Sequence, residues 1–166
     1  MPLSYNLPIS KQQKALLTCE AFWVFSLSHY KKQDVQSAAL ALQDKHKGNV
    51  NLALLLIWLD SLNIHFSFSH FPHLESSLIQ SDELLKSYRP LRKKIKNTQV
   101  LTLYQDALQV ELQIEKQQQS NLIAALLRIP LQVKTEVQSP SLLTDYCTRL
   151  NASSLIAALE ANTKTG

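Results

Sequence analysis

A row of cationic side chains in the middle of the chain has the residue types and the spacing of a binding surface. Relative to Arg89, the other members stand three residues before it and three, four and seven residues after it, so a helix would carry all of them on one face: Lys86, Arg89, Arg92, Lys93 and Lys96. Such a row can contact successive phosphates of a nucleic acid, or it can bind an acidic protein. No aromatic side chain interleaves with it on the outer side, and this weakens the case for single-stranded nucleic acid, because base stacking needs aromatic rings.

A solvated helix face that a neighbouring helix partly neutralises is the alternative interpretation of the same row. If residues 100–128 fold back antiparallel to it, we expect Asp106 near Arg92 and Glu111 near Lys86. Exposed ion pairs of this kind contribute only about 0–1 kcal/mol each. They would nevertheless reduce the charge that is available to a partner.

The remaining residues that could do chemistry form no recognisable catalytic or metal site. His65, His70 and His73 stand close to Glu75, and neutral imidazoles are good metal ligands, but their spacing fits no zinc pattern. Five carboxylates could point into a helical bundle, although the Glu-x-x-His pattern of di-iron bundles is missing: Glu20, Asp44, Asp60, Glu111 and Glu115. No spacing suggests a Ser–His–Asp or Cys–His arrangement. We therefore predict no metal, no cofactor and no catalytic residue, and hence a protein that is not an enzyme.

The composition is that of an ordinary globular chain without a nucleotide-binding loop. Hydrophobic residues make up 45% of the 166 residues and charged residues 18%, which argues against disorder. Gly48 is the sole glycine before the terminal Gly166, so a glycine-rich phosphate loop is excluded. A net charge of +4 is below that of a dedicated nucleic-acid binder. Cys19 and Cys147 have no disulfide-framework spacing, and no signal peptide or membrane-spanning segment is evident, so we expect a cytoplasmic protein.

The candidate residues depend for their position on a helical fold whose centre is predicted at residues 51–62. Residues 52–59 of this segment (LALLLIWL) are apolar without a break, far short of the about 20 residues that cross a bilayer. A helix that is apolar on all sides in a soluble chain is one that other helices surround. An aromatic helix around Trp23 and a hairpin made by residues 83–128 are expected to pack against it. The sequence therefore predicts an all-α, single-domain bundle of five to seven helices.

The other elements follow from periodicity and from the residues that start and stop helices. Besides the central helix, we predict helical segments, of which neighbouring ones can join, at about residues 12–30, 34–46, 73–80, 83–97, 100–128, 140–150 and 155–159. Pro90 should kink or restart its helix, and Gly48 should end the preceding helix with a positive φ. Residues 63–70 alternate like a strand that has no partner, and residues 116–121 are wholly polar, as in a bend or a projecting segment. Three regions result: a tail at 1–10, a helical core at 11–130, and a linker with C-terminal helices that pack on the core at 131–166.

Several short blocks of the sequence occur in an order that is typical of one family. They are residues 22–30 (FWVFSLSHY), 42–44 (LQD), 50–52 (VNL) leading to 58–59 (WL), 88–96 (YRPLRKKIK) and, as a later block, 111–115 (ELQIE). Together they resemble a family of short proteobacterial proteins, domain of unknown function 2390, and the resemblance covers about residues 15–130. It implies a helical fold and a cytoplasmic bacterial protein. It implies no activity, because the family has no established function.

The favoured interpretation is a non-catalytic binding, adaptor or regulatory protein. It docks a protein partner through the basic helix at residues 86–96, through the polar segment at 116–121, or through both. The second hypothesis is a nucleic-acid or ribosome-associated protein that uses the same basic helix. The third is a small-ligand protein or an enzyme with a pocket beside Trp23 and Trp58. A partner-binding role predicts an exposed apolar or basic patch, whereas a pocket predicts a cavity lined by converging polar groups.

Overall fold

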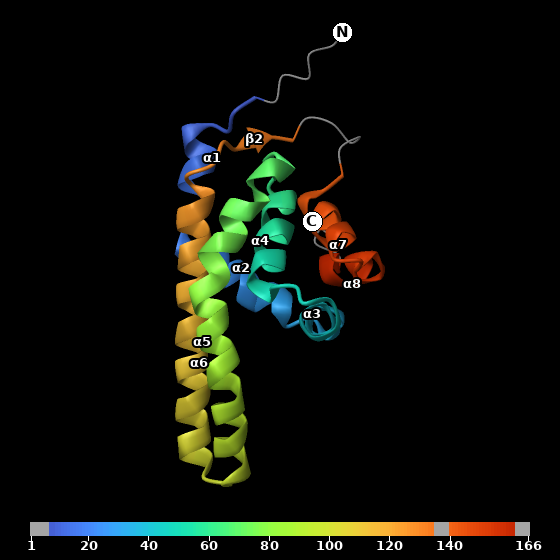
Figure 1. The fold of residues 1–166 in the computed structure, drawn as a ribbon. Coiled ribbons are helices and arrows are strands. Elements are labelled where there is room, and N and C mark those ends of the chain that lie inside the picture. Colours follow the sequence, from blue (N-terminus) through green and yellow to red (C-terminus); the bar gives the residue numbers. More distant parts are fainter. Residues whose placement is uncertain (1–6, 135–139, 162–166) are drawn as a thin grey trace.

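The computed structural model describes residues 7–134 and 140–161, and in these ranges nearly all of the regular structure is helical. The elements follow one another in this order: α1 (Lys11–Ala15), α2 (Cys19–Tyr30), α3 (Gln33–His46), α4 (Val50–Ser61), β1 (Ile64–His65), the 3₁₀ turn η1 (Phe68–His70), α5 (Phe71–Asn97), α6 (Leu101–Leu126), β2 (Gln132–Val133), α7 (Leu142–Arg149), the 3₁₀ turn η2 (Ser153–Leu155) and α8 (Ile156–Glu160). Figure 1 shows that α5 and α6 form a long hairpin, whose far half projects beyond a body made by the other elements. The predicted all-α fold is confirmed. None of the helices described is long and apolar enough to cross a membrane.

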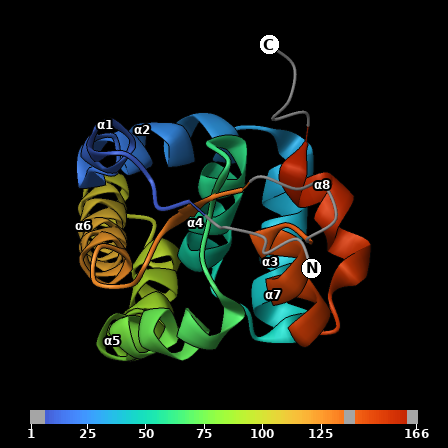
Figure 2. The same ribbon diagram turned by 90° about the horizontal axis from the view of Figure 1, so that it is seen from above.

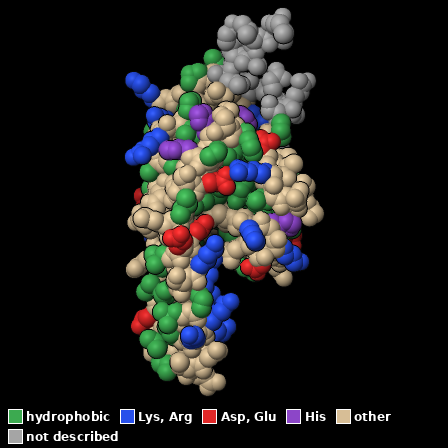
Figure 3. Space-filling model, viewed as in Figure 1, with side chains coloured by type: hydrophobic (Ala, Val, Ile, Leu, Met, Phe, Trp, Pro, Cys, Tyr) green, Lys and Arg blue, Asp and Glu red, His purple; other side chains and the backbone are tan. Residues whose placement is uncertain are grey.

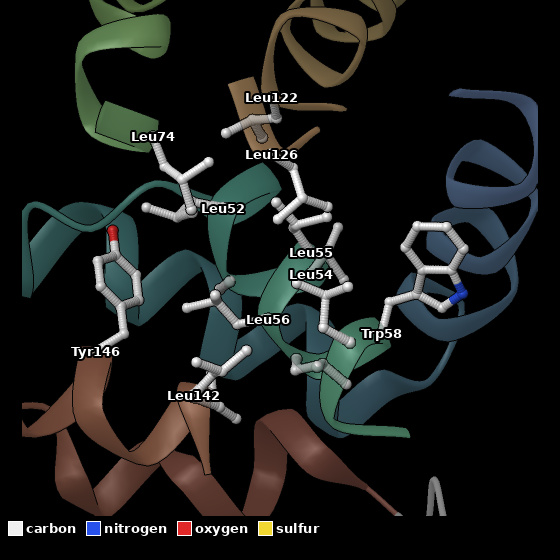
Figure 4. Packing of buried hydrophobic residues seen from close by; sticks show 14 of the residues in the cluster. Leu52, Leu54, Leu55, Leu56, Trp58, Leu74, Leu122, Leu126, Leu142 and Tyr146 are labelled. Carbon is white, nitrogen blue, oxygen red and sulfur yellow. The ribbon is translucent and has the colours of Figure 1, made fainter. Parts of the chain in front are cut away.

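Helix α4 lies in the middle of the body, where α2, α3, α6 and α7 all contact it. The side-chain oxygen of Asn49 caps its first turn by accepting a hydrogen bond from the backbone N–H of Leu52 (2.8 Å). The eight consecutive residues from Leu52 to Leu59 are all buried. Figure 2 shows α4 enclosed by the other helices, and Figure 4 shows its leucines among side chains of α5, α6 and α7. The prediction of a central helix that other helices surround is confirmed.

The C-terminal helices are attached to the body by polar contacts as well as by apolar packing. The Asp60 carboxylate at the end of α4 accepts hydrogen bonds from the N–H groups of Leu142 (3.0 Å) and Leu143 (3.1 Å) and so caps the first turn of α7. Burial raises the pKa of Asp60 above its ordinary value, although these two N–H groups oppose the rise. In α8, the carbonyl oxygen of Leu159 is hydrogen-bonded to His29 Nε2 of α2 (2.6 Å). Asp60, one of the candidate carboxylates, therefore serves as a helix cap.

Helix α5 is continuous from Phe71 to Asn97, so the predicted division into two helices is wrong, and the helix does not restart at Pro90. Pro90 lacks the N–H that would bond to the carbonyl of Lys86. Both residues are exposed, so water can satisfy that carbonyl. The packing of α5 along α6 holds its two halves in one helix.

Two strand residues pair where no partner was predicted. Ile64 and His65 form an antiparallel ladder with Gln132 and Val133, which come from the predicted linker after the hairpin. The pairing closes the end of the body from which the hairpin starts and returns. A short-range pattern could not have revealed it, because the two strands are separated by the whole of α5 and α6.

Helix α3 ends differently from the prediction. Lys47, and not Gly48, takes the left-handed conformation at the end of the helix (φ 57°). Gly48 is needed for space instead, because an added Cβ would lie 2.7 Å from Leu42 Cγ and 2.9 Å from Leu150 Cδ1. Because position 48 has no side chain, the backbone after α3 can pass close to Leu42 and to Leu150 of the C-terminal region.

Candidate functional site

The far half of the hairpin, residues 84–112, exposes an unusual amount of apolar surface, and we refer to it as the outer hairpin. Eight large apolar side chains in this segment are 36–66% exposed: Leu84, Leu91, Val100, Leu101, Leu103, Leu108, Val110 and Leu112. Figure 1 shows this part of α5 and α6 beyond the body. Clustered apolar side chains on a protein surface mark sites of interaction. The outer hairpin is therefore the candidate functional site.

One side of the outer hairpin, which we name the apolar face, joins an apolar stripe of α5 to one of α6. In each stripe the members are three or four residues apart and are thus neighbours on the helix surface: Leu84, Tyr88, Leu91 and Ile95 on α5, and Leu103, Ala107, Val110 and Ile114 on α6. The Tyr88 hydroxyl donates a hydrogen bond to the carbonyl oxygen of Ala107 (2.5 Å) and so links the two stripes. Figure 3 shows apolar side chains gathered along one edge of the projecting arm.

The other side, which we name the ion-pair face, combines charged and apolar side chains. Arg92 of α5 forms an ion pair with Glu111 of α6, and Arg89 Nε lies 4.0 Å from the same carboxylate. Nearer the tip, Lys96 Nζ lies 5.8 Å from the centre of the Tyr104 ring. Leu101 and Leu108 of α6 stand three and four residues from Tyr104, and Leu112 stands four residues after Leu108, so the three leucines share this side. In Figure 3, Lys and Arg side chains gather on the edge of the arm that faces the hollow beside the body.

The five cations predicted as a binding row share one side of α5 but divide into two kinds. The side chains of Arg89 and Arg92 are only 28% and 19% exposed, because they pack against the Glu111 carboxylate. Lys86, Lys93 and Lys96 are exposed.

The predicted ion-pair register was wrong, since Glu111 pairs with Arg92 and not with Lys86. Side chains on a helix lean toward its N-terminus. The long Arg92 side chain therefore reaches away from the tip of the hairpin, to the level of Glu111.

A second carboxylate lies where the ion-pair face meets the body. Burial raises the pKa of Glu115, the charge of Glu111 raises it further, and Arg89 and Arg92 oppose the rise. Tyr30, at the end of α2, belongs to the same cluster, and its pKa is raised by burial and then by the charge of Glu115. Two guanidinium groups and two carboxyl groups thus balance one another at the root of the hairpin. The net positive charge of the ion-pair face comes from its lysines.

The polar segment of α6 is not the exposed docking surface that was predicted. Gln118 and Gln119 are only 1% and 2% exposed. Gln118 Oε1 accepts from Asn51 Nδ2 (2.8 Å), and Gln118 Nε2 donates to Ser81 Oγ (2.7 Å). Gln119 Nε2 donates to Ser26 Oγ (2.9 Å) and to Asn51 Oδ1 (3.0 Å). The two glutamines therefore connect α6 to α2, α4 and α5 inside the protein, where a partner cannot reach them.

The two tryptophans proposed as the walls of a pocket pack in different places. Trp58 is 7% exposed and stacks on Phe22, with ring centroids 5.4 Å apart, and on Phe25, with centroids 6.4 Å apart. Trp23 instead lies under the ammonium group of Lys116, which is 5.0 Å from its ring centre. The structure does not bring Trp23 and Trp58 together as one binding surface.

Glu75, the carboxylate near the three histidines in the sequence, is engaged by another group. Glu75 forms an ion pair with Arg149 of α7 (2.6 Å). His65 belongs to β1, and burial lowers its pKa. Among residues 7–134 and 140–161, no three His, Cys, Asp or Glu side chains gather as a metal site requires.

The fold and the site define a small all-α protein with a projecting, amphipathic hairpin. The family model described as "Protein of unknown function (DUF2390)" matches residues 21–122, which is more than half of the chain. The protein belongs to this family, and the resemblance seen in the sequence is confirmed. No curated protein and no solved structure matches the chain. The matched region contains the whole outer hairpin, so the candidate site lies within the part of the chain that the family model covers.

Proposed function

We propose that this protein is a non-catalytic adaptor or regulator that docks a protein partner through the outer hairpin. The observation that carries the proposal is the apolar face, on which Leu84, Leu91, Leu103 and Val110 are 43–54% exposed. Full burial of such a side chain contributes about 1.5–3 kcal/mol, so covering four half-exposed ones contributes roughly 3–6 kcal/mol before the cost of association. This is enough for a hot spot of binding, with charged contacts needed to supply the rest.

Nucleic acid is the less supported partner. Arg89 and Arg92 are the side chains best shaped to hold phosphate, and both already face Glu111. The exposed leucines of the hairpin would gain nothing from a phosphate backbone.

Photo-cross-linking in cells tests the proposal. A benzoylphenylalanine at position Leu103 should give one dominant adduct, because the side chain points from the apolar face. The matched control is the same probe at Leu40, which is 50% exposed on α3 of the body and should give none. The double variant Leu91→Gln/Val110→Gln should remove the adduct at position 103 while the protein stays folded, at a cost of about 1–2 kcal/mol in the free energy of unfolding, since both side chains are half-exposed.

The proposal is wrong if position 103 gives no adduct, or if positions 103 and 40 give the same adducts in equal yield.

A further inference from the structure

We infer that the ion-pair face of the outer hairpin binds an acidic amphipathic helix of the partner protein. This inference rests on the proposed function and adds the chemistry of the partner. It depends on three features of this face: its uncompensated lysines, its exposed leucines, and the spacing of both.

The charge of the ion-pair face is one-sided. Between residues 86 and 97 the chain has six Lys or Arg residues and no Asp or Glu. Glu111 and Glu115 offset the charge of the two arginines of this set, but Lys86, Lys93 and Lys96 form no salt bridge with any residue that the structure describes. Their side chains are exposed along one edge of α5. An acidic partner is therefore the one that this edge attracts and orients.

The opposite edge of the same face is apolar. Leu101, Leu108 and Leu112 of α6 are 66%, 39% and 36% exposed. Between this edge and the lysines lie the Arg92–Glu111 ion pair and the Tyr104 ring. A partner that lies along the hairpin thus meets leucines on one flank and ammonium groups on the other. An amphipathic helix presents an apolar stripe beside a polar one and so can contact both flanks at once.

The spacing of the two edges favours a helix over an extended peptide. Lys86 and Lys93 are seven residues apart, and so are Leu101 and Leu108. Seven residues of helix rise about 10.5 Å, which is the heptad repeat of helices that pack lengthwise. A partner helix with Leu and Glu at heptad positions repeats its contacts with the same period.

A nucleic acid or a second copy of this chain fits the face less well. Phosphates would meet the Glu111 carboxylate between the arginines and the leucines on the far edge. A second copy would present the same run of six cations, without an acidic residue between positions 86 and 97 to oppose the lysines.

Peptide binding to the full-length protein tests the inference. The probe is a fluorescein-labelled synthetic helix of about 20 residues, with Leu at the a and d heptad positions and Glu on the flanks, and its twin carries Lys in place of Glu. By fluorescence anisotropy, the Glu peptide should bind at least about tenfold more tightly than the Lys peptide, and added salt should reduce the difference.

Two sets of variants locate the binding. The triple variant Lys86→Glu/Lys93→Glu/Lys96→Glu should weaken the Glu peptide at least about tenfold. The matched control Lys11→Glu/Lys14→Glu/Lys45→Glu changes the net charge equally at exposed sites on the body and should leave the affinity within about twofold. On the other edge, Leu101→Gln/Leu108→Gln should also weaken the Glu peptide, whereas Leu27→Gln/Leu40→Gln should not.

Several results would overturn the inference. They are absence of binding by the Glu peptide, equal binding of the two peptides, or equal loss in the two triple variants. Binding of a labelled RNA duplex that the lysine variant abolishes, with no peptide binding, would assign the face to nucleic acid. A dimer in light scattering that the lysine variant dissociates would assign it to a second copy. If the adduct at position 103 forms but the Glu peptide does not bind, the docking role stands and only the partner chemistry is wrong.

Discussion

Replacement of Gln118 by Leu should remove the hydrogen bonds that join the hairpin to the body while nearly keeping the volume of the side chain. Gln118 Oε1 accepts from Asn51 Nδ2 at 2.8 Å, and its Nε2 donates to Ser81 Oγ at 2.7 Å and to Asp82 Oδ1 at 2.9 Å. After the substitution, Ser81 still bonds to a helix carbonyl and Asp82 still bonds to Asn49. The Nδ2 group of Asn51 is then the one left without its acceptor.

The magnitude follows from these contacts. A donor without an acceptor costs about 1–3 kcal/mol where it is fully buried, and the lost bond to the Asp82 carboxylate adds about 1.5–3 kcal/mol. Since Asn51 and Asp82 are both half-buried, water recovers part of each cost. We expect Gln118→Leu to lower the free energy of unfolding by about 2–4 kcal/mol.

The neighbouring residue provides a matched control for this substitution. Gln117 is exposed and its side chain bonds to that of Asn121 (3.0 Å), so Gln117→Leu should change the free energy of unfolding by less than about 0.5 kcal/mol. Urea denaturation followed by far-UV circular dichroism measures both variants, with the slope of the transition checked for equality. If the two variants unfold within about 0.5 kcal/mol of each other, the buried role of Gln118 is refuted.

Three further predictions concern the body and the root of the hairpin. Leu55→Ala in α4 should lower the free energy of unfolding, measured by urea denaturation, by about 2–5 kcal/mol, because Leu55 is fully buried. Leu27→Ala, at a 46% exposed site, should lower it by about 1 kcal/mol or less. Similar losses in the two variants would contradict a central α4. Gly48→Ala should lower the melting temperature through a loss of about 1–3 kcal/mol, because its Cβ has no room, and an unchanged melting temperature would show that the chain relaxes there. Burial and the charge of Glu111 raise the folded-state pKa of Glu115, so the folded protein holds this proton more tightly than the unfolded chain, and the stability this gives is lost as the pH rises through the raised pKa. Glu115→Gln should therefore stabilise the protein more at neutral pH than below the ordinary carboxyl pKa, and an equal effect at both pH values would contradict the sign.

The centre of the fold could be predicted because its signal is local. An unbroken apolar run at residues 52–59 has no polar side to place in water, so other helices must cover it. Local reasoning fails for α5. Pro90 is tolerated there because the carbonyl that it leaves unpaired belongs to the exposed Lys86, and because α6 supports the helix from the other side. A local helix-breaking rule cannot weigh such tertiary support.

The polar segment shows a second limit of the sequence. A run such as Gln117, Gln118 and Gln119 looks exposed, because polar residues usually are. Two of the three are buried, and their partners lie between 36 and 93 residues away in the chain. Burial of an amide depends on whether the fold supplies those partners, and no short-range pattern contains that information.

Part of the candidate site could be predicted from the sequence. The cationic row on α5 could be placed on one helix face from spacing alone, but its division into paired arginines and free lysines needed the register of the hairpin. The α6 sequence carries two apolar stripes, although one suffices to pack against α5. The second stripe is a signal from which an exposed surface could have been predicted, although it was not. Only the direction of the hairpin relative to the body shows that the other helices leave it uncovered.

Carbene footprinting of the unmodified protein, alone and in complex with the partner that the cross-link at position 103 identifies, tests the central claim most directly, because the label reports the exposure of each apolar side chain. In the free protein, Leu103 and Leu108 should be labelled strongly and Leu55 hardly at all. Both hairpin leucines should lose their label in the complex. Labelling of Leu103 as low as that of Leu55 in the free protein, or unchanged labelling of both hairpin leucines in the complex, would contradict the outer hairpin as the docking site.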